Sequence, residues 1–196
     1  MKNAISLKNI KKSYGDMTVL DSVSATFSDS IAIMGASGKG KTTLLRIIMG
    51  LEKADGGEVS FEVKPRFCTV FQEERLFDGF SAIDNVCAVA SKKMPRAEAE
   101  RRAQELLCAL LIDKSEHQKN VGAYSGGMRR RVAIARALFA DGNILVLDEP
   151  YKGLDPHTRE VCASVICKYA NDRLILLITH DDREAELTRI GDIFYI

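Results

Sequence analysis

Apolar and polar residues alternate near the N-terminus of this chain and give way to unbroken apolar runs further along. The alternation predicts half-buried strands, first from residue 5 to a turn at 13–16 and then at residues 19–27 and 58–63. Residues 193–196 predict a short edge strand. Unbroken runs predict fully buried strands at residues 31–34, 67–71, 144–147 and 174–178.

Helical spacing fills most of the stretch from about residue 78 to 138. It is clearest at residues 97–111, where Pro95 lies near the predicted start. Two further helices are predicted, one ending near Gly50 and one at residues 158–169. Strands that alternate with helices indicate an α/β fold on a parallel sheet, with the long helical stretch inserted in its middle.

Composition narrows the classes of protein. A length of 196 residues suits one domain over residues 1–196, and a hydrophobic share of 46% allows a substantial core. The net charge of +1 gives no basic field for nucleic acid. No apolar run approaches the roughly 20 residues that span a bilayer, and residues 1–4 do not begin a signal peptide. An odd number of cysteines without metal-ligand spacing indicates reduced thiols in a cytosol; they are Cys68, Cys87, Cys108, Cys162 and Cys167.

A glycine-rich segment follows the buried run at residues 31–34 and satisfies the phosphate-loop pattern G-x-x-x-x-G-K-[ST]. Its glycines let backbone N–H groups surround a polyphosphate, and the following helix adds the positive end of its dipole. Lys41 would reach the β- and γ-phosphates, and the Thr42 hydroxyl would bind Mg²⁺. The predicted nucleotide contacts are Gly35, Ala36, Ser37, Gly38, Lys39, Gly40, Lys41, Thr42 and Thr43.

A pair of carboxylates follows the buried run at residues 144–147. Asp148 would hold Mg²⁺ directly or through water, and Glu149 is placed to polarise an attacking water. Adjacent residues at a strand end point apart, so one carboxylate can face the metal and the other the γ-phosphate. Without the phosphate loop upstream, the pair would more simply be a turn with two solvated acids.

A third segment, residues 124–128, reads Tyr-Ser-Gly-Gly-Met and precedes an arginine-rich helix. Here the chain resembles the ATP-binding cassette (ABC) ATPases, whose signature is close to Leu-Ser-Gly-Gly-Gln. The resemblance implies that Ser125, Gly126 and Gly127 bind the γ-phosphate of ATP held by a second copy, in a head-to-tail homodimer with two ATP molecules between the subunits. Taken alone, arginines 129–131 are typical of a solvated helix face, and we expect this for at least two of the three.

Other positions match the family one by one. Tyr14 resembles the aromatic residue that stacks on adenine, and Gln72 resembles the glutamine near Mg²⁺ and the attacking water. Asp155 lies in a stretch similar to the loop that signals across the dimer, and His180 resembles the switch histidine that contacts the γ-phosphate. Without the family, a turn tyrosine or a structural histidine would explain these residues as well. The departures from the family pattern include Lys39, Tyr124 and Met128.

The resemblance covers essentially the whole chain. It implies a RecA-like P-loop NTPase core over about 1–77 and 139–196, with a mainly parallel sheet and an N-terminal antiparallel β region. A helical subdomain over about 78–138 would be inserted in it. The activity implied is ATP hydrolysis coupled to transport, with ATP and Mg²⁺ as cofactors. The implied catalytic residues are Glu149, His180 and Gln72, and the implied metal ligands are Thr42, Gln72 and Asp148.

Residues 71–77, 82–86 and 125–129 most resemble the nitrate/sulfonate/taurine-type importer ATPases. That likeness implies a cytoplasmic subunit held at the inner face of the membrane by a transmembrane permease. It also implies an extracytoplasmic solute-binding protein in the full system and no nucleic-acid partner. An exporter or lipoprotein-release ATPase and a soluble cluster-assembly-type ATPase remain alternatives, whereas a small-molecule kinase would lack the signature. A permease helix would dock on a groove floored by Leu76, Phe77, Phe80 and Ile83, unless these residues pack in the core.

Overall fold

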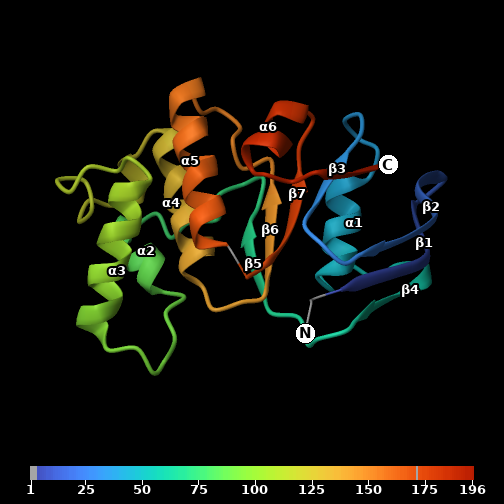
Figure 1. Ribbon diagram of the computed structural model, residues 1–196, viewed down its shortest axis with the longest axis horizontal. Helices are drawn as coiled ribbons and strands as arrows, with labels where there is room; N and C mark the ends of the chain where they lie inside the picture. The colour runs from blue at the N-terminus through green and yellow to red at the C-terminus, as the bar shows by residue number, and fades with distance from the viewer. Residues whose placement is uncertain (1–3, 171) are drawn as a thin grey trace.

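A computed structural model describes residues 4–170 and 172–196 (Figure 1). Residues 1–3, which belong to the stretch where the sequence indicates no signal peptide, lie outside the described part. The strands are β1 (Ile5–Tyr14), β2 (Met17–Phe27), β3 (Ile31–Met34), β4 (Gly56–Phe61), β5 (Phe67–Val70), β6 (Ile144–Asp148), β7 (Leu174–Ile178) and β8 (Asp192–Tyr195). The helices are α1 (Lys41–Ile48), α2 (Ala82–Cys87), α3 (Arg96–Ala109), the short 3₁₀ helix η1 (Val121–Ala123), α4 (Gly126–Phe139), α5 (Pro156–Tyr169) and α6 (Asp182–Leu187).

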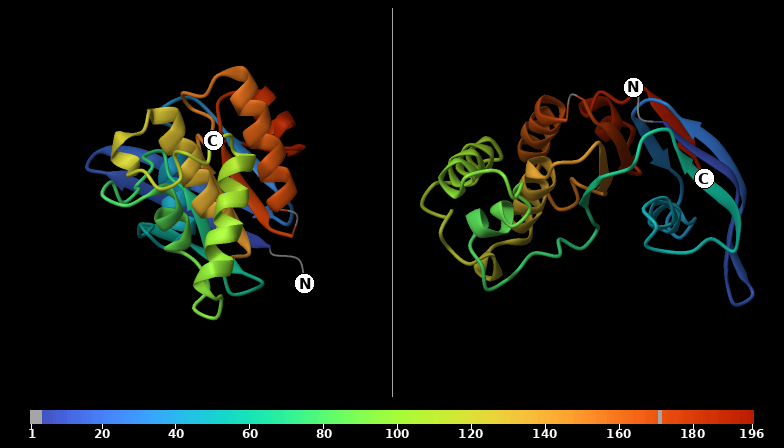
Figure 2. Two further views of the ribbon diagram at one scale, coloured as in Figure 1. Left: turned by 90° about the vertical axis from the view of Figure 1, so that its left-hand side faces the viewer. Right: turned by 90° about the horizontal axis from the view of Figure 1, so that it is seen from below.

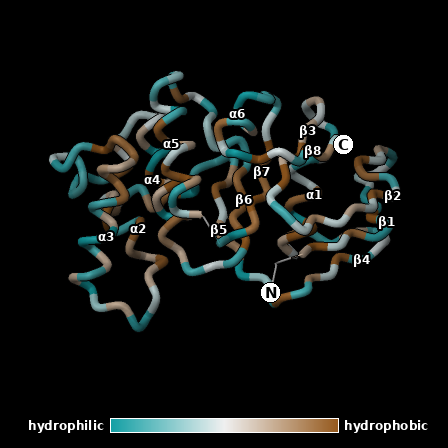
Figure 3. The backbone as a smooth tube through the Cα atoms, viewed as in Figure 1, coloured by the Kyte–Doolittle hydropathy of each residue, from teal (hydrophilic) through white to brown (hydrophobic). Residues whose placement is uncertain are grey.

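The larger sheet has five parallel strands in the order β5-β6-β7-β3-β8. Its strands present alternate residues to two faces, because side chains along a strand point to opposite sides. Ile33, Val146 and Leu176 face α1 and the smaller sheet. Leu145 and Leu177 face the opposite way, toward α4 and α5. Burial on both faces explains why these strands read as unbroken apolar runs, and Figure 3 shows β6 as a hydrophobic strand in the middle of the molecule.

The smaller sheet is antiparallel, with strand order β2-β1-β4. The right-hand view of Figure 2 shows its strands curving around α1. Only one face of this sheet is buried, through Ile5, Ile10 and Leu20 among others, which explains the apolar–polar alternation. The smaller sheet therefore fixes α1, and with it the phosphate loop, against the larger sheet.

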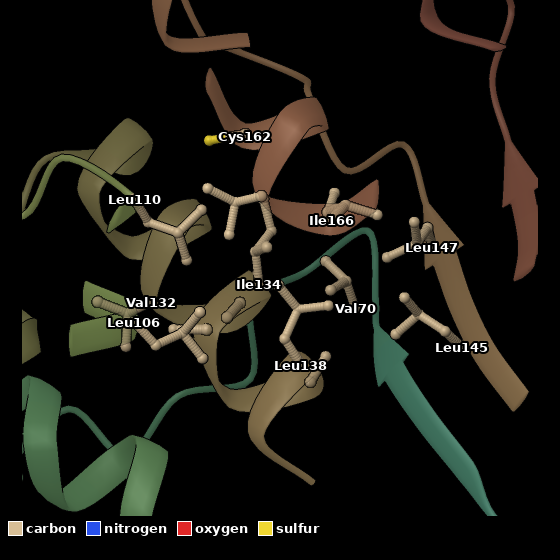
Figure 4. Close-up of a cluster of buried hydrophobic side chains, with 14 of the residues drawn as sticks. Val70, Leu106, Leu110, Val132, Ile134, Leu138, Leu145, Leu147, Cys162 and Ile166 are labelled. Carbon is tan, nitrogen blue, oxygen red and sulfur yellow. The ribbon is translucent and has the colours of Figure 1, made fainter. Parts of the chain in front are cut away.

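Helices α2, α3 and α4 form the end of the molecule opposite the antiparallel sheet (Figure 1). Figure 4 shows one hydrophobic cluster that runs from Leu106 of α3, through Val132 and Ile134 of α4, to Val70 of β5 and Leu147 of β6. Helix α4 is buried between the outer helices and the sheet. Because α4 packs against β5 and β6, a shift of α4 would also displace residues near the ends of these strands.

The α/β fold with a parallel sheet is confirmed, and so are the predicted buried strands and the edge strand β8. The stretch 78–138 is less helical than its pattern indicated, because the residues between α3 and α4 are mostly turns and loop. Strand β4 already begins at Gly56, two residues before the strand predicted at residues 58–63. Helix α6 was not predicted, because only its buried Glu184 and Ala185 mark an inner face. The division into a core and a helical subdomain stays a prediction.

None of the helices within residues 4–170 and 172–196 combines the length and the apolar character needed to cross a bilayer.

Candidate functional site

The phosphate loop turns sharply between β3 and α1. Gly40, the residue before α1, has a φ of 91°, and a Cβ there would lie 2.7 Å from the Cγ1 of Val19. Only glycine fits both the backbone and the space. The Lys41 side chain is nine-tenths buried and folds back over the loop, where its Nζ donates to the carbonyls of Gly35 (2.7 Å) and Ala36 (2.9 Å). The ammonium group is thus held at the mouth of the loop, beside the N-terminus of α1.

Thr42 and Asp148 meet at the junction of α1 and β6. The Thr42 hydroxyl donates to an Asp148 carboxylate oxygen at 3.2 Å, and Gln72 lies beside both in a small adjoining cavity of 50 Å³. The pKa of Asp148 is raised, mainly by burial, while the Thr42 hydrogen bond and the charges of Arg46 and Arg130 oppose the rise. A hydroxyl, an amide and a buried carboxylate provide the oxygen donors that Mg²⁺ prefers, so this donor set fits the ion.

Glu149 follows β6 with a φ of 48°, which is unusual for a residue with a side chain. Its N–H donates to the carbonyl of Ile178 at 3.1 Å, which ties it to the end of β7. The Glu149 carboxylate accepts from Gln72 Nε2 at 3.4 Å and pairs with Lys152 Nζ at 3.3 Å. The three polar side chains therefore form one group at the carboxyl ends of the parallel strands.

A cleft of 660 Å³ opens over the phosphate loop. Its wall includes Gln72, Glu149 and His180, and Lys152 also lines it. His180 is exposed and comes two residues after β7, so it reaches the cleft from the strand next to that of Glu149. All the predicted phosphate-loop residues line the cleft except Lys39, whose exposed position contrasts with that of Lys41. The lining residues of the loop are Gly35, Ala36, Ser37, Gly38, Gly40, Lys41, Thr42 and Thr43.

Tyr14 also lines the cleft, together with Met17 and Val19. Its ring is held from two sides: the hydroxyl donates to the Glu52 carboxylate, and Lys12 Nζ lies 5.2 Å from the ring centroid. The pKa of Tyr14 is raised, above all by the hydrogen bond to Glu52. An anchored, half-exposed aromatic ring in the wall of the cleft is suited to stack on a flat base.

The signature segment lies elsewhere on the molecule. Ser125 is the N-cap of α4 and accepts from Met128 N at 3.3 Å, while Gly126 is exposed. Asp155 is the N-cap of α5 and accepts from Thr158 N at 3.0 Å. Thr158 holds the pKa of Asp155 below its ordinary value, first through its side chain and then through this backbone bond. None of the predicted residues Ser125, Gly126, Gly127 and Asp155 lines the cleft of the same chain. The exposed start of α4 is nevertheless a possible anion site.

Sequence reasoning missed three side chains near the site. Glu52 carried no signal because its partner, Tyr14, is distant in the sequence. Lys152 lies only three residues after its partner Glu149, but no pattern in the sequence indicated that the two side chains pair. At least two of the arginines at 129–131 were expected to be solvated; Arg129 and Arg131 are partly exposed, whereas Arg130 is only 4% exposed. All three donate to backbone carbonyls, Arg129 to Val121 and Arg131 to residues that include Leu111.

Comparisons with known proteins agree with this arrangement. A family model described as "ABC transporter" matches residues 20–152. The aliphatic sulfonates import ATP-binding protein SsuB of Corynebacterium glutamicum is 35% identical to this chain, over 94% of this chain and 77% of that protein. The sulfate/thiosulfate import ATP-binding protein CysA 1 of Chromobacterium violaceum is 36% identical, over 93% of this chain but only 56% of that protein. The chain thus spans little more than half the length of the sulfate relative.

Solved structures give the same result. The dimeric structure of MJ0796, a bacterial ABC transporter cassette, superimposes with a TM-score of 0.85 at 29% identity, over 98% of this chain and 94% of that one. A second dimeric structure of MJ0796, in a post-hydrolysis state bound to ADP and Pi, matches with the same TM-score and coverage.

Proposed function

The chain belongs to the ABC transporter family of ATPases, and from that premise we propose that it powers an importer of a small organic or inorganic solute. Binding and hydrolysis of ATP are the common property of the family. The direction of transport is the proposal, and it is supported by relatives named as import proteins for sulfonates and for sulfate or thiosulfate. One observation carries the ATPase assignment to particular residues, namely the single cleft that gathers Lys41, Gln72, Glu149 and His180.

We propose that each end of the cleft receives one part of ATP. Tyr14 stacks on the adenine, and the phosphate loop surrounds the phosphates through its backbone N–H groups. Lys41 neutralises the β- and γ-phosphates. Thr42, Asp148 and Gln72 hold Mg²⁺, which supplies charge neutralisation at the phosphates when it is bound.

In this proposal Glu149 accepts a proton from the attacking water as the water approaches the γ-phosphate, and Gln72 helps to orient that water. His180 donates a hydrogen bond to a γ-phosphate oxygen. Lys152 pairs with Glu149 in the structure, and its ammonium group is free to turn toward the phosphates in the same cleft. The water-activating carboxylate would then be released when the nucleotide enters.

The second half of the nucleotide site would come from a second copy of the chain. Ser125, Gly126 and Gly127 lie at the start of α4, outside the phosphate-loop cleft of their own chain, which agrees with a site completed in trans. Gly127 lies beside the loop that leads to Asp155, since a Cβ on Gly127 would lie 3.5 Å from Leu154 Cδ2. We propose a homodimer in which these segments cover the partner's ATP.

A permease would bind at the helical end of the molecule, which we propose as a subdomain over about 78–138. A groove of 530 Å³ lies there, and Phe77 and Phe80 are more than half exposed beside it, with ring centroids 5.8 Å apart. Ile83 was expected in the groove floor but is buried in the core, and Leu76 packs against that core. The permease would hold the subunit at the inner face of the membrane, and an extracytoplasmic solute-binding protein would complete the system.

The Glu149→Gln variant tests the proposed chemistry. It should bind ATP with wild-type affinity and lose turnover by about a hundredfold or more, because the amide keeps the shape and loses the basicity. ATP should also trap a dimer that size-exclusion chromatography detects. Glu62→Gln, at an exposed position away from the cleft, is the control and should turn over normally. An active Glu149→Gln enzyme would place the base elsewhere.

Phe80→Arg tests the permease. The variant should fold and bind ATP but fail to co-purify with a membrane partner, whereas Tyr195→Arg, at an exposed position on the edge strand β8, should still co-purify. If the wild-type chain is recovered without any membrane partner under gentle detergent, the importer proposal fails and the cluster-assembly-type alternative gains.

A further inference from the structure

The arginines of α4 hold the chain segment that carries Gln72. Arg130 donates from Nη1 to the carbonyl of Phe71 at 2.7 Å and from Nη2 to the carbonyl of Gln72 at 2.6 Å. Its Nη2 also pairs with the Glu74 carboxylate at 3.2 Å. Arg136, further along the helix, donates to the carbonyls of Glu74 (3.0 Å) and Arg75 (2.9 Å). The backbone from residue 71 to 75 is therefore fastened to one helix by two side chains.

Arg130 is the buried member of the pair. Its side chain is 4% exposed, and its Nε has no hydrogen-bond partner, whereas the guanidinium of an arginine on a solvated face would be hydrated. Burying a charge destabilises the fold unless hydrogen bonds and ion pairs offset the lost hydration, so a buried arginine is not needed merely to fill space. Its planar fork matches two successive carbonyls, a geometry that lysine cannot reproduce.

The contacts of Arg130 join two parts of the proposed ATPase site. On one side, Arg130 belongs to the second turn of α4, whose N-cap is Ser125. On the other side, the Gln72 side chain donates to Glu149 at 3.4 Å. The order of contacts is thus the start of α4, Arg130, the Gln72 backbone and the Glu149 carboxylate. No other side chain of the described residues is recorded as donating to the Gln72 carbonyl.

We propose that Arg130 is a positioning residue, which locks the backbone at Gln72 to the helix whose N-terminus would contact the partner's ATP. A shift of α4 on dimer closure then changes the reach of Gln72 toward Glu149 and the attacking water. Arg130 acts through Gln72 and touches no substrate itself. The inference rests on the proposed roles of Gln72 and Glu149.

Steady-state ATPase assays on the purified chain test this with Arg130→Met, which keeps the length of the side chain and removes its charge and donors. We expect kcat to fall by about tenfold or more, since a small displacement of a catalytic group has effects of that size, and the ATP dissociation constant to stay within about twofold. Hydrogen exchange at residues 72–75 should speed up. Arg173→Met is the control, because Arg173 also donates to three carbonyls, those of Ala137, Leu138 and Ala140, but not to the Gln72 segment.

A double-mutant cycle decides between positioning and general destabilisation. In a Gln72→Ala background the loss caused by Arg130→Met should shrink to about twofold or less, because the group that Arg130 positions is already gone. Arg130→Lys keeps the charge but not the two-pronged contact, and it provides a folded variant with an intermediate kcat if the methionine variant misfolds. Full additivity in the cycle, or a wild-type kcat in a folded Arg130→Met chain, would overturn the proposal. If Gln72→Ala alone leaves turnover normal, the assigned role of Gln72 fails first, and this inference fails with it.

Discussion

Helices α1 and α4 both begin next to glycines, yet their first turns lie in very different surroundings. The start of α1 is enclosed: Gly40 precedes it, Lys41 is nine-tenths buried, and the 660 Å³ cleft lies over the loop. The start of α4 is open: Ser125 and Gly126 are exposed and do not line the cleft over the phosphate loop of the same chain. Both provide free N–H groups and the positive end of a helix dipole.

The difference indicates which half of the ATP site a single chain completes. At α1, backbone turns, a buried lysine and the side-chain oxygens of Thr42 and Asp148, which we propose bind Mg²⁺, lie together in one chain. At α4, the Ser125 hydroxyl is already used to cap its own helix by accepting from Met128 N. One chain is therefore expected to bind ATP alone and to need a second copy for hydrolysis. The following experiments test that division.

Lys41→Ala should have the largest effect. It removes the ammonium group that donates to the loop carbonyls of Gly35 and Ala36, so affinity for ATP should fall by about a hundredfold or more. Isothermal titration with ATP measures this directly. Lys39→Ala is the matched control, two residues earlier in the same loop. It should bind ATP nearly normally because Lys39 does not line the cleft. Near-normal turnover by Lys41→Ala would remove the phosphate loop from the mechanism.

Ser125→Arg should separate binding from hydrolysis. The variant should bind ATP as a monomer with wild-type affinity, because Ser125 lies outside its own cleft, and it should fail to form the ATP-dependent dimer. Turnover should then fall to the level of an isolated subunit. Mixing Ser125→Arg with Lys41→Ala chains can place both lesions in one of the two sites and leave the other whole, so partial recovery of activity is expected if one site suffices. Normal dimerisation by Ser125→Arg alone would contradict a site completed in trans.

The sequence predicted the enclosed half of the site better than the open half. The phosphate loop and the carboxylate pair are local patterns, in which residue order along the chain fixes the geometry between a buried strand and a helix. The arginines of α4 are different, because whether Arg130 is solvated or buried depends on where residues 71–74 fold, far away in the sequence. Glu52 was missed for the same reason. The partner of Glu52, which lies in the loop after α1, is Tyr14 at the end of β1. Lys152 is close to Glu149 in the sequence, but only the structure shows that the two side chains pair.

Asp148→Asn tests whether the buried Asp148 carboxylate destabilises the folded chain when no ligand is bound. Burial raises the pKa of Asp148, so the folded chain binds this proton more tightly than the unfolded chain does. Stability must then fall as pH rises from the unfolded value of about 4 through the raised folded value. The Asn variant has no such carboxylate, so its free energy of unfolding by urea at neutral pH without nucleotide should be about 0.5–2 kcal/mol higher than that of the wild type. Its Mg²⁺-dependent turnover should disappear. The same stability in Asp148→Asn and wild type, or a gain also in the exposed control Asp192→Asn, would argue against a strained carboxylate.

Tyr14→Phe should have the smallest effect, because the base end of the cleft is held by side chains at the surface rather than by the buried backbone of the phosphate loop. Removing the hydroxyl frees the ring from Glu52 but leaves it available for stacking. One net hydrogen bond corresponds to about 0.5–1.5 kcal/mol, so KM for ATP should rise by roughly two- to tenfold with kcat unchanged. Glu52→Gln keeps an acceptor oxygen, so its KM for ATP should lie between those of the wild type and Glu52→Ala. The double variant Tyr14→Phe/Glu52→Ala should have the same KM for ATP as Glu52→Ala alone, since the hydrogen bond between the two residues can be lost only once. A fall in kcat instead of a rise in KM would mean that Tyr14 acts on the phosphates, and the separation of the cleft into a base end and a phosphate end would be wrong.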